Sequence, residues 1–168
     1  VITLNGVSKV FFAPGWRIGY MAWHDPKNQL SHVRDGVERL LRSRLCASSP
    51  AQFGYLAGIQ GSKESLKENY SRILRRLDYS MKRISEINGI ECHRPGGAFY
   101  LFVKITNSIY SNDDKKFVLD LLHKKHVLVV HGSGFSPEFG KGHFRMVCLP
   151  SINVLKEAFN RIDEFLNS

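Results

Sequence analysis

The spacing of hydrophobic residues changes several times along the chain, and each change predicts the start of a new element. Two short runs rich in β-branched and aromatic residues, Val1–Leu4 and Arg17–Trp23, predict strands, and Pro14-Gly15 predicts a turn between them. The next apolar residues recur at helical spacing; they are Leu30, Val33, Val37, Leu40, Leu41 and Leu45. A further helix is predicted to start at Ser48-Ser49-Pro50, and residues 51–61 are apolar on most sides, which predicts that it is buried.

The longest periodic stretch predicts a helix of about 25 residues, which would be about 37 Å long. Its end is predicted at Asn88-Gly89, a typical helix stop. The apolar stripe of this helix consists of Leu66, Tyr70, Ile73, Leu74, Leu77, Met81 and Ile84. Because a helix of this length is unusual inside one globular domain, we interpret it as a bridge between two domains.

The remaining residues alternate between strand and helix patterns. The segment "IECHRPGGAFYLFVKI" predicts strand, turn and strand, with Phe99, Leu101, Val103 and Ile105 on one face. Then follow a short helix starting at Ser111, Asn112 or Asp113, a strand "VLVV", a glycine-rich loop, a strand "HFRMVCL" and a last helix starting at Pro150-Ser151. This order predicts an α/β protein: the end of one domain, a bridging helix and a small α/β domain.

Composition narrows the classes of protein that fit this pattern. The chain has 168 residues, of which 43% are hydrophobic, so it can bury a core. A net charge of +9 would suit an anionic partner, but the basic residues are mixed with glutamates and no RNP, KH or zinc-finger pattern occurs. No apolar run approaches the roughly 20 residues of a membrane helix, and no signal peptide is visible. The chain opens at Val1 inside a strand pattern, which predicts a piece of a longer protein.

The cysteines argue against a disulfide framework. Cys46, Cys92 and Cys148 are far apart, and no CxxC pattern occurs. An odd number without a close pair is typical of a reducing compartment, and the missing pattern argues against a structural zinc site.

Three cations stand in otherwise apolar segments: Lys9, Arg17 and Arg145. Lys9 and Arg17 fall in the half-buried strand–turn–strand pattern, where a cation must either reach water or meet an anion. A lysine can form a Schiff base with a carbonyl, and an arginine can bind a phosphate or carboxylate through two parallel hydrogen bonds. The alternatives are a surface lysine for Lys9, an ion pair with Asp25 for Arg17 and a structural ion pair for Arg145.

The glycine-rich loop from Gly132 to Gly142 could bring its backbone close to a ligand. It contains neither the phosphate-loop pattern GxxxxGK[ST] nor the GxSxG turn of serine hydrolases, so by itself the loop indicates no particular chemistry.

Three motifs, in this order, resemble the class I/II aminotransferases, which are fold-type I pyridoxal-phosphate enzymes. The "SK" pair, followed after seven residues by "RIGY", resembles their cofactor-lysine segment. "RPGGAFYLFVKI" is similar to their small-domain strand motif, and "VLVVHGSGF" with "GKGHFRMVCLPS" is similar to their substrate-carboxylate motif. The resemblance covers the whole chain but only the C-terminal part of such an enzyme, and it is nearest to the alanine/aspartate transaminase branch.

The resemblance implies pyridoxal 5′-phosphate as the cofactor, with an amino acid and a 2-oxo acid as substrates. By this resemblance, Lys9 would form the Schiff base with the cofactor and then act as the base of the proton shift, with Ser8 beside it at the cofactor. Arg17 would hold the cofactor phosphate, and Arg145 would hold the substrate carboxylate.

The resemblance also implies how the chain is divided and where it works. Residues 1–62 would be the C-terminal remnant of the large cofactor-binding domain, and residues 63–168 the small C-terminal domain with the long bridging helix. Members of the family are homodimers, so we expect a cytoplasmic homodimer without a nucleic-acid or membrane partner. Because most of the large domain is missing, including the aspartate that contacts the pyridine nitrogen, we expect the chain alone to be inactive or nearly so.

Two positions depart from the family pattern. Gly6 stands where the family often has a phosphate-binding serine, and His131 stands where many members have proline.

Two other functions stay open. A lyase, decarboxylase or synthase of the same fold type would use Lys9, Arg17 and Arg145 equally well. A transcription regulator with an aminotransferase-like effector domain is the other alternative.

Overall fold

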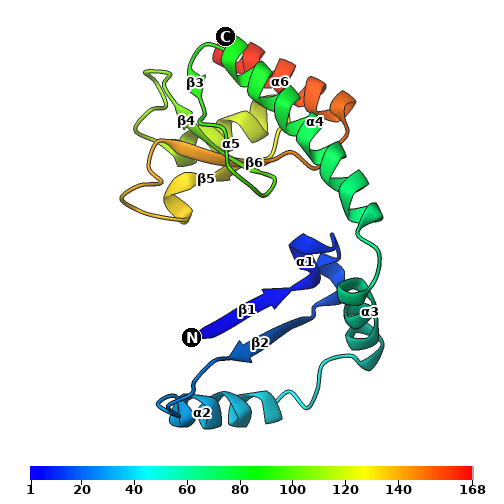
Figure 1. Ribbon diagram of the computed structural model, residues 1–168. Helices are drawn as coiled ribbons and strands as arrows, with labels where there is room; N and C mark the ends of the chain where they lie inside the picture. The colour runs from blue at the N-terminus through cyan, green and yellow to red at the C-terminus, as the bar shows by residue number, and fades with distance from the viewer. Residues whose placement is uncertain (168) are drawn as a thin grey trace. The chain divides into compact units, whose positions relative to one another are not determined.

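The chain folds into two compact units, Val1–Glu68 and Asn69–Ser168. The computed structural model describes residues 1–167, for residue 65 without its side chain. The division between the units lies inside helix α4 (Glu64–Glu86), the long helix in Figure 1. Its 23 residues agree with the predicted length, and the chain leaves it through Gly89, whose φ of +95° favours glycine.

The first unit begins with two antiparallel strands, β1 (Ile2–Gly6) and β2 (Gly19–Trp23). The chain between them forms one helical turn, α1 (Val7–Val10), and a 3-10 turn, η1 (Pro14–Trp16). Helices α2 (Ser31–Arg42) and α3 (Ser49–Gln60) follow. The core of this unit is small, and its buried residues are Val7, Ile18, Ala51 and Tyr55.

Several expectations for the first unit are wrong. Lys9 lies in a helical turn and not in a strand–turn–strand pair, and both Lys9 and Arg17 are exposed. Only Ala51 and Tyr55 are buried in α3, although the whole segment was expected to be buried. The periodicity of apolar residues predicts a partner surface for each helix, and residues 1–68 supply that surface only in part.

The second unit is built on an antiparallel sheet with the strand order β3-β4-β6-β5. Its strands are β3 (Ile90–Glu91), β4 (Tyr100–Ile105), β5 (Val130–His131) and β6 (His143–Val147). The strand predicted at "VLVV" is shorter than expected, because Val127 and Val129 are buried without joining the ladder. Arg145 stands in β6, opposite Phe102 of β4.

Three helices pack their apolar residues on one face of this sheet: α4, α5 (Asp114–Lys125) and α6 (Ile152–Leu166). The predicted alternation in β4 is confirmed, since every second side chain from Phe99 to Ile105 is buried. The predicted start of α5 is confirmed too, because the Asp113 carboxylate accepts a hydrogen bond from the Lys116 N–H at 3.0 Å. The largest fully buried side chains are Phe117, Phe144 and Phe159.

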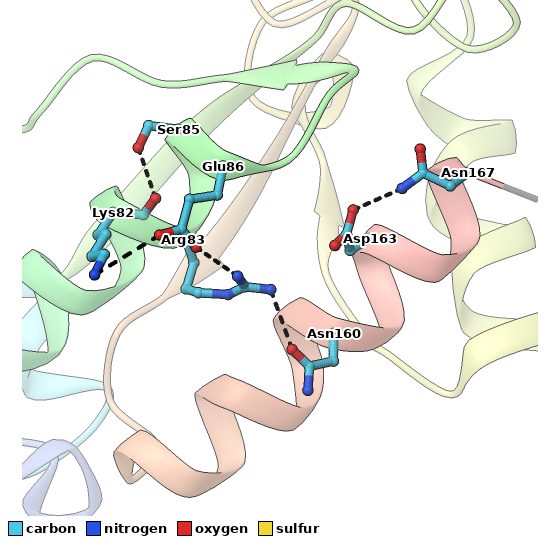
Figure 2. Close-up of polar contacts among 7 residues, drawn as sticks. All are labelled: Lys82, Arg83, Ser85, Glu86, Asn160, Asp163 and Asn167. Carbon is cyan, nitrogen blue, oxygen red and sulfur yellow. Dashed lines mark hydrogen bonds and ion pairs between the residues drawn. The ribbon is translucent and has the colours of Figure 1, made fainter.

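Polar contacts add to this packing where α4 runs beside α6 (Figures 1 and 2). Nη2 of Arg83 donates to Oδ1 of Asn160 at 3.2 Å, and Nη1 contacts Oε2 of Glu86 at 2.6 Å. The bond to Asn160 connects two helices that are far apart in the sequence, and the contact with Glu86 lies within α4. The C-terminal part of α4 therefore belongs to the second unit.

Candidate active site

Helix α1 presents Ser8 and Lys9 directly after strand β1. Val7, the first residue of α1, is buried, and its N–H donates to the Ile18 carbonyl at 3.2 Å. The Ala13 N–H returns to the Val7 carbonyl at 3.4 Å. These bonds fix the turn that carries Lys9 against the residue that follows Arg17. Ser8 is half-buried in this position, and Lys9 is exposed.

Arg17 occupies the end of η1 in the left-handed conformation, with φ 51°. Its side chain is oriented by one hydrogen bond, from Nη1 to the Pro14 carbonyl at 2.9 Å. The alternative of an ion pair with Asp25 is wrong, because the Asp25 carboxylate accepts the N–H groups of Gln29 and Leu30 at 3.0 and 2.7 Å. Lys9, Ser8 and Arg17 therefore stand on one short segment that joins β1 to β2.

Gly6, one of the departures from the family pattern, lies where the two strands come close together. A Cβ at this position would meet the Ile18 carbonyl oxygen at 3.1 Å, and a Cβ on the opposite Gly19 would meet the Asn5 carbonyl oxygen at 2.5 Å. A serine at Gly6 would require the backbone of Ile18 to move by a few tenths of an ångström. The local packing is thus adapted to glycine at both positions.

Arg145 lies in the second unit, on the face of β6 that points away from the helices. Its guanidinium carbon is 4.8 Å from the centre of the Tyr100 ring and 4.3 Å from that of Phe135. The ion pairs of the described residues do not include Arg145, so these residues do not supply the structural ion pair that was its alternative. Arg145 is half-buried, whereas its neighbours Phe144 and Met146 are buried, as the alternation of a strand requires.

A buried carboxylate that sequence reasoning missed fixes the start of the glycine-rich loop. Asp114, 3% exposed, accepts the Ser133 N–H at 2.8 Å. Nδ1 of His131 lies 3.0 Å from the Ser133 hydroxyl and 3.7 Å from the Asp114 carboxylate. The departure at His131 thus contributes to this anchor. The available signal for Asp114 was the pair of aspartates at the start of the predicted short helix.

Asp114 should make the stability of the second unit depend on pH. Burial alone would raise the pKa of Asp114, but hydrogen bonds from the N–H and hydroxyl of Ser133 and from the Gly142 N–H outweigh it, and the net pKa is lowered. A lowered carboxyl pKa stabilises the fold above the ordinary aspartate pKa, and this stabilisation is lost as the pH falls through the lower, folded value. We expect Asp114→Asn to lower the free energy of unfolding at pH 7 by about 1.5–3 kcal/mol.

The difference between Asp114→Asn and the unchanged chain should shrink below about pH 4. Urea unfolding followed by far-UV circular dichroism at several pH values measures it. Asp113→Asn is a control at the neighbouring position, where the side chain is an exposed helix cap. A difference that stays constant from pH 7 to pH 3 would contradict the assignment to the ionised carboxylate.

Residues 1–162 match the family model for aminotransferase class I and II. The chain belongs to this family. It is 38% identical to the glutamate-pyruvate aminotransferase AlaA of Haemophilus influenzae, over 99% of this chain and 42% of that protein. The alanine aminotransferase of Mycobacterium bovis is 35% identical, over 99% of this chain and 39% of that protein.

Solved structures agree with this assignment. The alanine aminotransferase from Pyrococcus furiosus superposes with a TM-score of 0.93 and 53% identity, over 99% of this chain and 42% of that one. An aminotransferase from Escherichia coli gives a TM-score of 0.91 and 33% identity, again over 42% of its length. The chain therefore spans about two-fifths of the aminotransferases it matches, and its expected fold, part of an α/β aminotransferase, is confirmed.

Enzymes of this family depend on pyridoxal 5′-phosphate, and the donors found in the first unit fit that molecule. Its aldehyde requires a primary amine, which Lys9 presents on the surface of α1. Its phosphate requires hydrogen-bond donors with positive charge, and the Arg17 guanidinium has donors beyond the one that bonds Pro14. Within residues 1–167, no helix is long and apolar enough to cross a membrane.

Proposed function

We propose that this chain is the C-terminal part of an aminotransferase that moves an amino group between an amino acid of the alanine or aspartate type and a 2-oxo acid. The observation that carries the proposal is the exposed side chain of Lys9, on a segment whose backbone is bonded to the residue next to Arg17, in a chain that matches aminotransferases along 99% of its length. The same residues would serve a lyase or decarboxylase, but the relatives compared above are named aminotransferases, which favours amino-group transfer.

Each proposed site residue has a separate role. Lys9 would hold the cofactor through Nζ, and its amine would serve as the base for the proton that leaves the substrate Cα. Arg17 holds the cofactor phosphate, with Ser8 as a neighbouring hydroxyl donor, and Arg145 holds the substrate carboxylate. When bound, pyridoxal 5′-phosphate supplies the electron sink, and the protein supplies its orientation.

The proposal extends to the organisation of the whole enzyme. Residues 1–62 belong to the large cofactor-binding domain, and residues 63–168 form the small domain together with the bridging helix. The enzyme works as a homodimer in the cytoplasm. The 168-residue chain alone is inactive or nearly so, because the side chains expected around the cofactor ring lie in the part of the enzyme that this chain does not span.

Reductive labelling tests the role of Lys9. The full-length enzyme and the 168-residue chain are incubated with pyridoxal 5′-phosphate, reduced with borohydride, digested, and analysed by mass spectrometry for the modified lysine. In the full-length enzyme we expect nearly stoichiometric modification at Lys9, because an amine beside a phosphate anchor reacts at a high effective concentration. Arg17→Ala should lower this labelling about tenfold or more.

Lys27→Ala is the matched control, because Lys27 is an exposed lysine in the turn that follows β2. It should leave labelling and the absorption band of the bound cofactor unchanged. Modification of the full-length enzyme at another lysine, with Lys9 unlabelled, would overturn the proposed role of Lys9.

A further inference from the structure

Arg145 is held by two aromatic rings that belong to different elements of the second unit. Tyr100 is the first residue of β4, and Phe135 follows η2 (Gly132–Gly134) in the glycine-rich loop. The two ring centres lie 4.8 and 4.3 Å from the guanidinium carbon, well inside the range of a cation–π contact. We call these two residues the aromatic clamp.

The clamp takes the place of the partner that a half-buried arginine ordinarily needs. The two rings contact the faces of the Arg145 guanidinium, and the ion pairs of the described residues do not include it, so a ligand could bind to the donors on its edges. Contacts through the faces of the guanidinium restrict its rotation and leave those edges accessible. A carboxylate approaching an edge then meets a group that has already lost most of its rotamer freedom.

The Phe135 side of the clamp is itself held by neighbouring residues. Phe135 contacts Phe102 with ring centres 6.2 Å apart, and Phe102 stacks on His143 at 5.1 Å. The Phe135 N–H donates to the Gly132 carbonyl at 2.8 Å, which ties the ring to the loop start that Asp114 fixes through Ser133. The two ends of the loop also come close together, because a Cβ on Gly132 would clash with the Gly140 carbonyl oxygen.

We propose that Phe135 and Tyr100 are positioning residues for carboxylate binding, which act by holding the guanidinium of Arg145 in the orientation that receives the substrate. The proposal rests on the proposed function, in which Arg145 binds the substrate carboxylate. It adds the specific consequence that substrate affinity depends on the conformation of a loop residue. Phe135 is 50% exposed, so its ring contributes little to the core and its effect should be local.

The test is steady-state transamination by the full-length enzyme, with L-alanine as donor and 2-oxoglutarate as acceptor. Phe135→Leu removes the ring and keeps an apolar side chain, and it should raise the KM for L-alanine about 3- to 10-fold, with kcat within about twofold. Tyr100→Leu should act in the same direction. Phe139→Leu is the matched control, because Phe139 lies in the same loop and is 75% exposed, and it should change neither constant.

A second readout follows Arg145 directly in the 168-residue chain. The Nε–H resonance of Arg145, assigned from Arg145→Lys, should carry a ring-current shift that Phe135→Leu reduces and Phe139→Leu preserves. A KM and a resonance that respond no more to Phe135→Leu than to Phe139→Leu would overturn the clamp. A different result would show that the proposed function is wrong while the clamp is right. In that result the full-length enzyme without substitutions catalyses no transamination, but the Arg145 resonance of the 168-residue chain still responds to Phe135→Leu.

Discussion

Phe117→Ala is expected to lower the free energy of unfolding of the second unit by about 3–5 kcal/mol. Phe117 is 0% exposed and its ring contacts three other rings, those of Tyr110, Phe144 and Phe165, with centres 5.1 to 5.6 Å away. Removing the ring loses the favourable free energy of transferring it from water into the core, and it leaves a cavity at the centre of the core. The three rings come from α6, β6 and the segment before α5, so no single element can move in to fill the space.

Unfolding in urea can follow the two units separately. Both tryptophans, Trp16 and Trp23, lie in residues 1–68, so tryptophan emission reports on the first unit, whereas far-UV circular dichroism also reports on the helices of the second. Phe117→Ala should shift the dichroism transition and leave the emission transition in place. Leu119→Ala is a control on the same helix at a 53% exposed position, and its effect should stay within about 0.5 kcal/mol. Equal effects of the two variants would contradict the central place of Phe117 in the core.

The second unit could be predicted well because its partners lie inside the chain. The alternating apolar residues of β4 and the apolar face of α6 each predict burial, and the structure packs both into one core. The errors there are local. Val127 and Val129 are buried, as the alternating pattern of a strand predicts. A strand also needs a neighbouring strand for its backbone hydrogen bonds, and the spacing of apolar residues does not show whether there is one.

The first unit could be predicted less well, and the reason is physical. The apolar residues of α2 and α3 indicate that something covers these helices, but Leu40, Leu41 and Phe53 are exposed in the structure. Periodicity identifies the face of a helix and not the segment that packs on it. In a chain that spans about two-fifths of its relatives, a pattern can be read correctly while the predicted burial is wrong.

In the candidate site, too, the sequence pattern identifies the residues but does not identify the side chains that contact them. Lys9, Arg17 and Arg145 stand out in the sequence because cations in apolar segments are rare, and the family resemblance gave each a role. Tyr100 and Phe135 lie inside two of the family-like motifs, but neither received a role, since aromatic residues in a strand and a loop are ordinary. Their contact with Arg145 depends on the pairing of β4 with β6 and on the fold of the loop, which only the structure provides.

Lys9→Ala is expected to lower kcat of the full-length enzyme about 1,000-fold or more. Alanine removes the only group on α1 that can both bind an aldehyde and exchange a proton, since the other side chains of α1 are those of Val7, Ser8 and Val10. General acid–base catalysis alone contributes about 10²–10⁴ in rate, and the loss of the covalent attachment adds to that deficit. Binding of the cofactor phosphate should persist, because Arg17 remains.

The decisive comparison is between Lys9→Ala, Lys27→Ala and Lys9→Ala supplied with methylamine. Lys27→Ala should keep the kcat of the unchanged enzyme within about twofold, because this exposed side chain follows β2 and lies outside α1 and η1. Methylamine should restore part of the lost rate, since a free amine can accept the proton but lacks the effective concentration that the tethered Nζ has. Retention of more than about a tenth of kcat in Lys9→Ala would show that another group carries the proton, because the expected loss is at least a hundredfold larger.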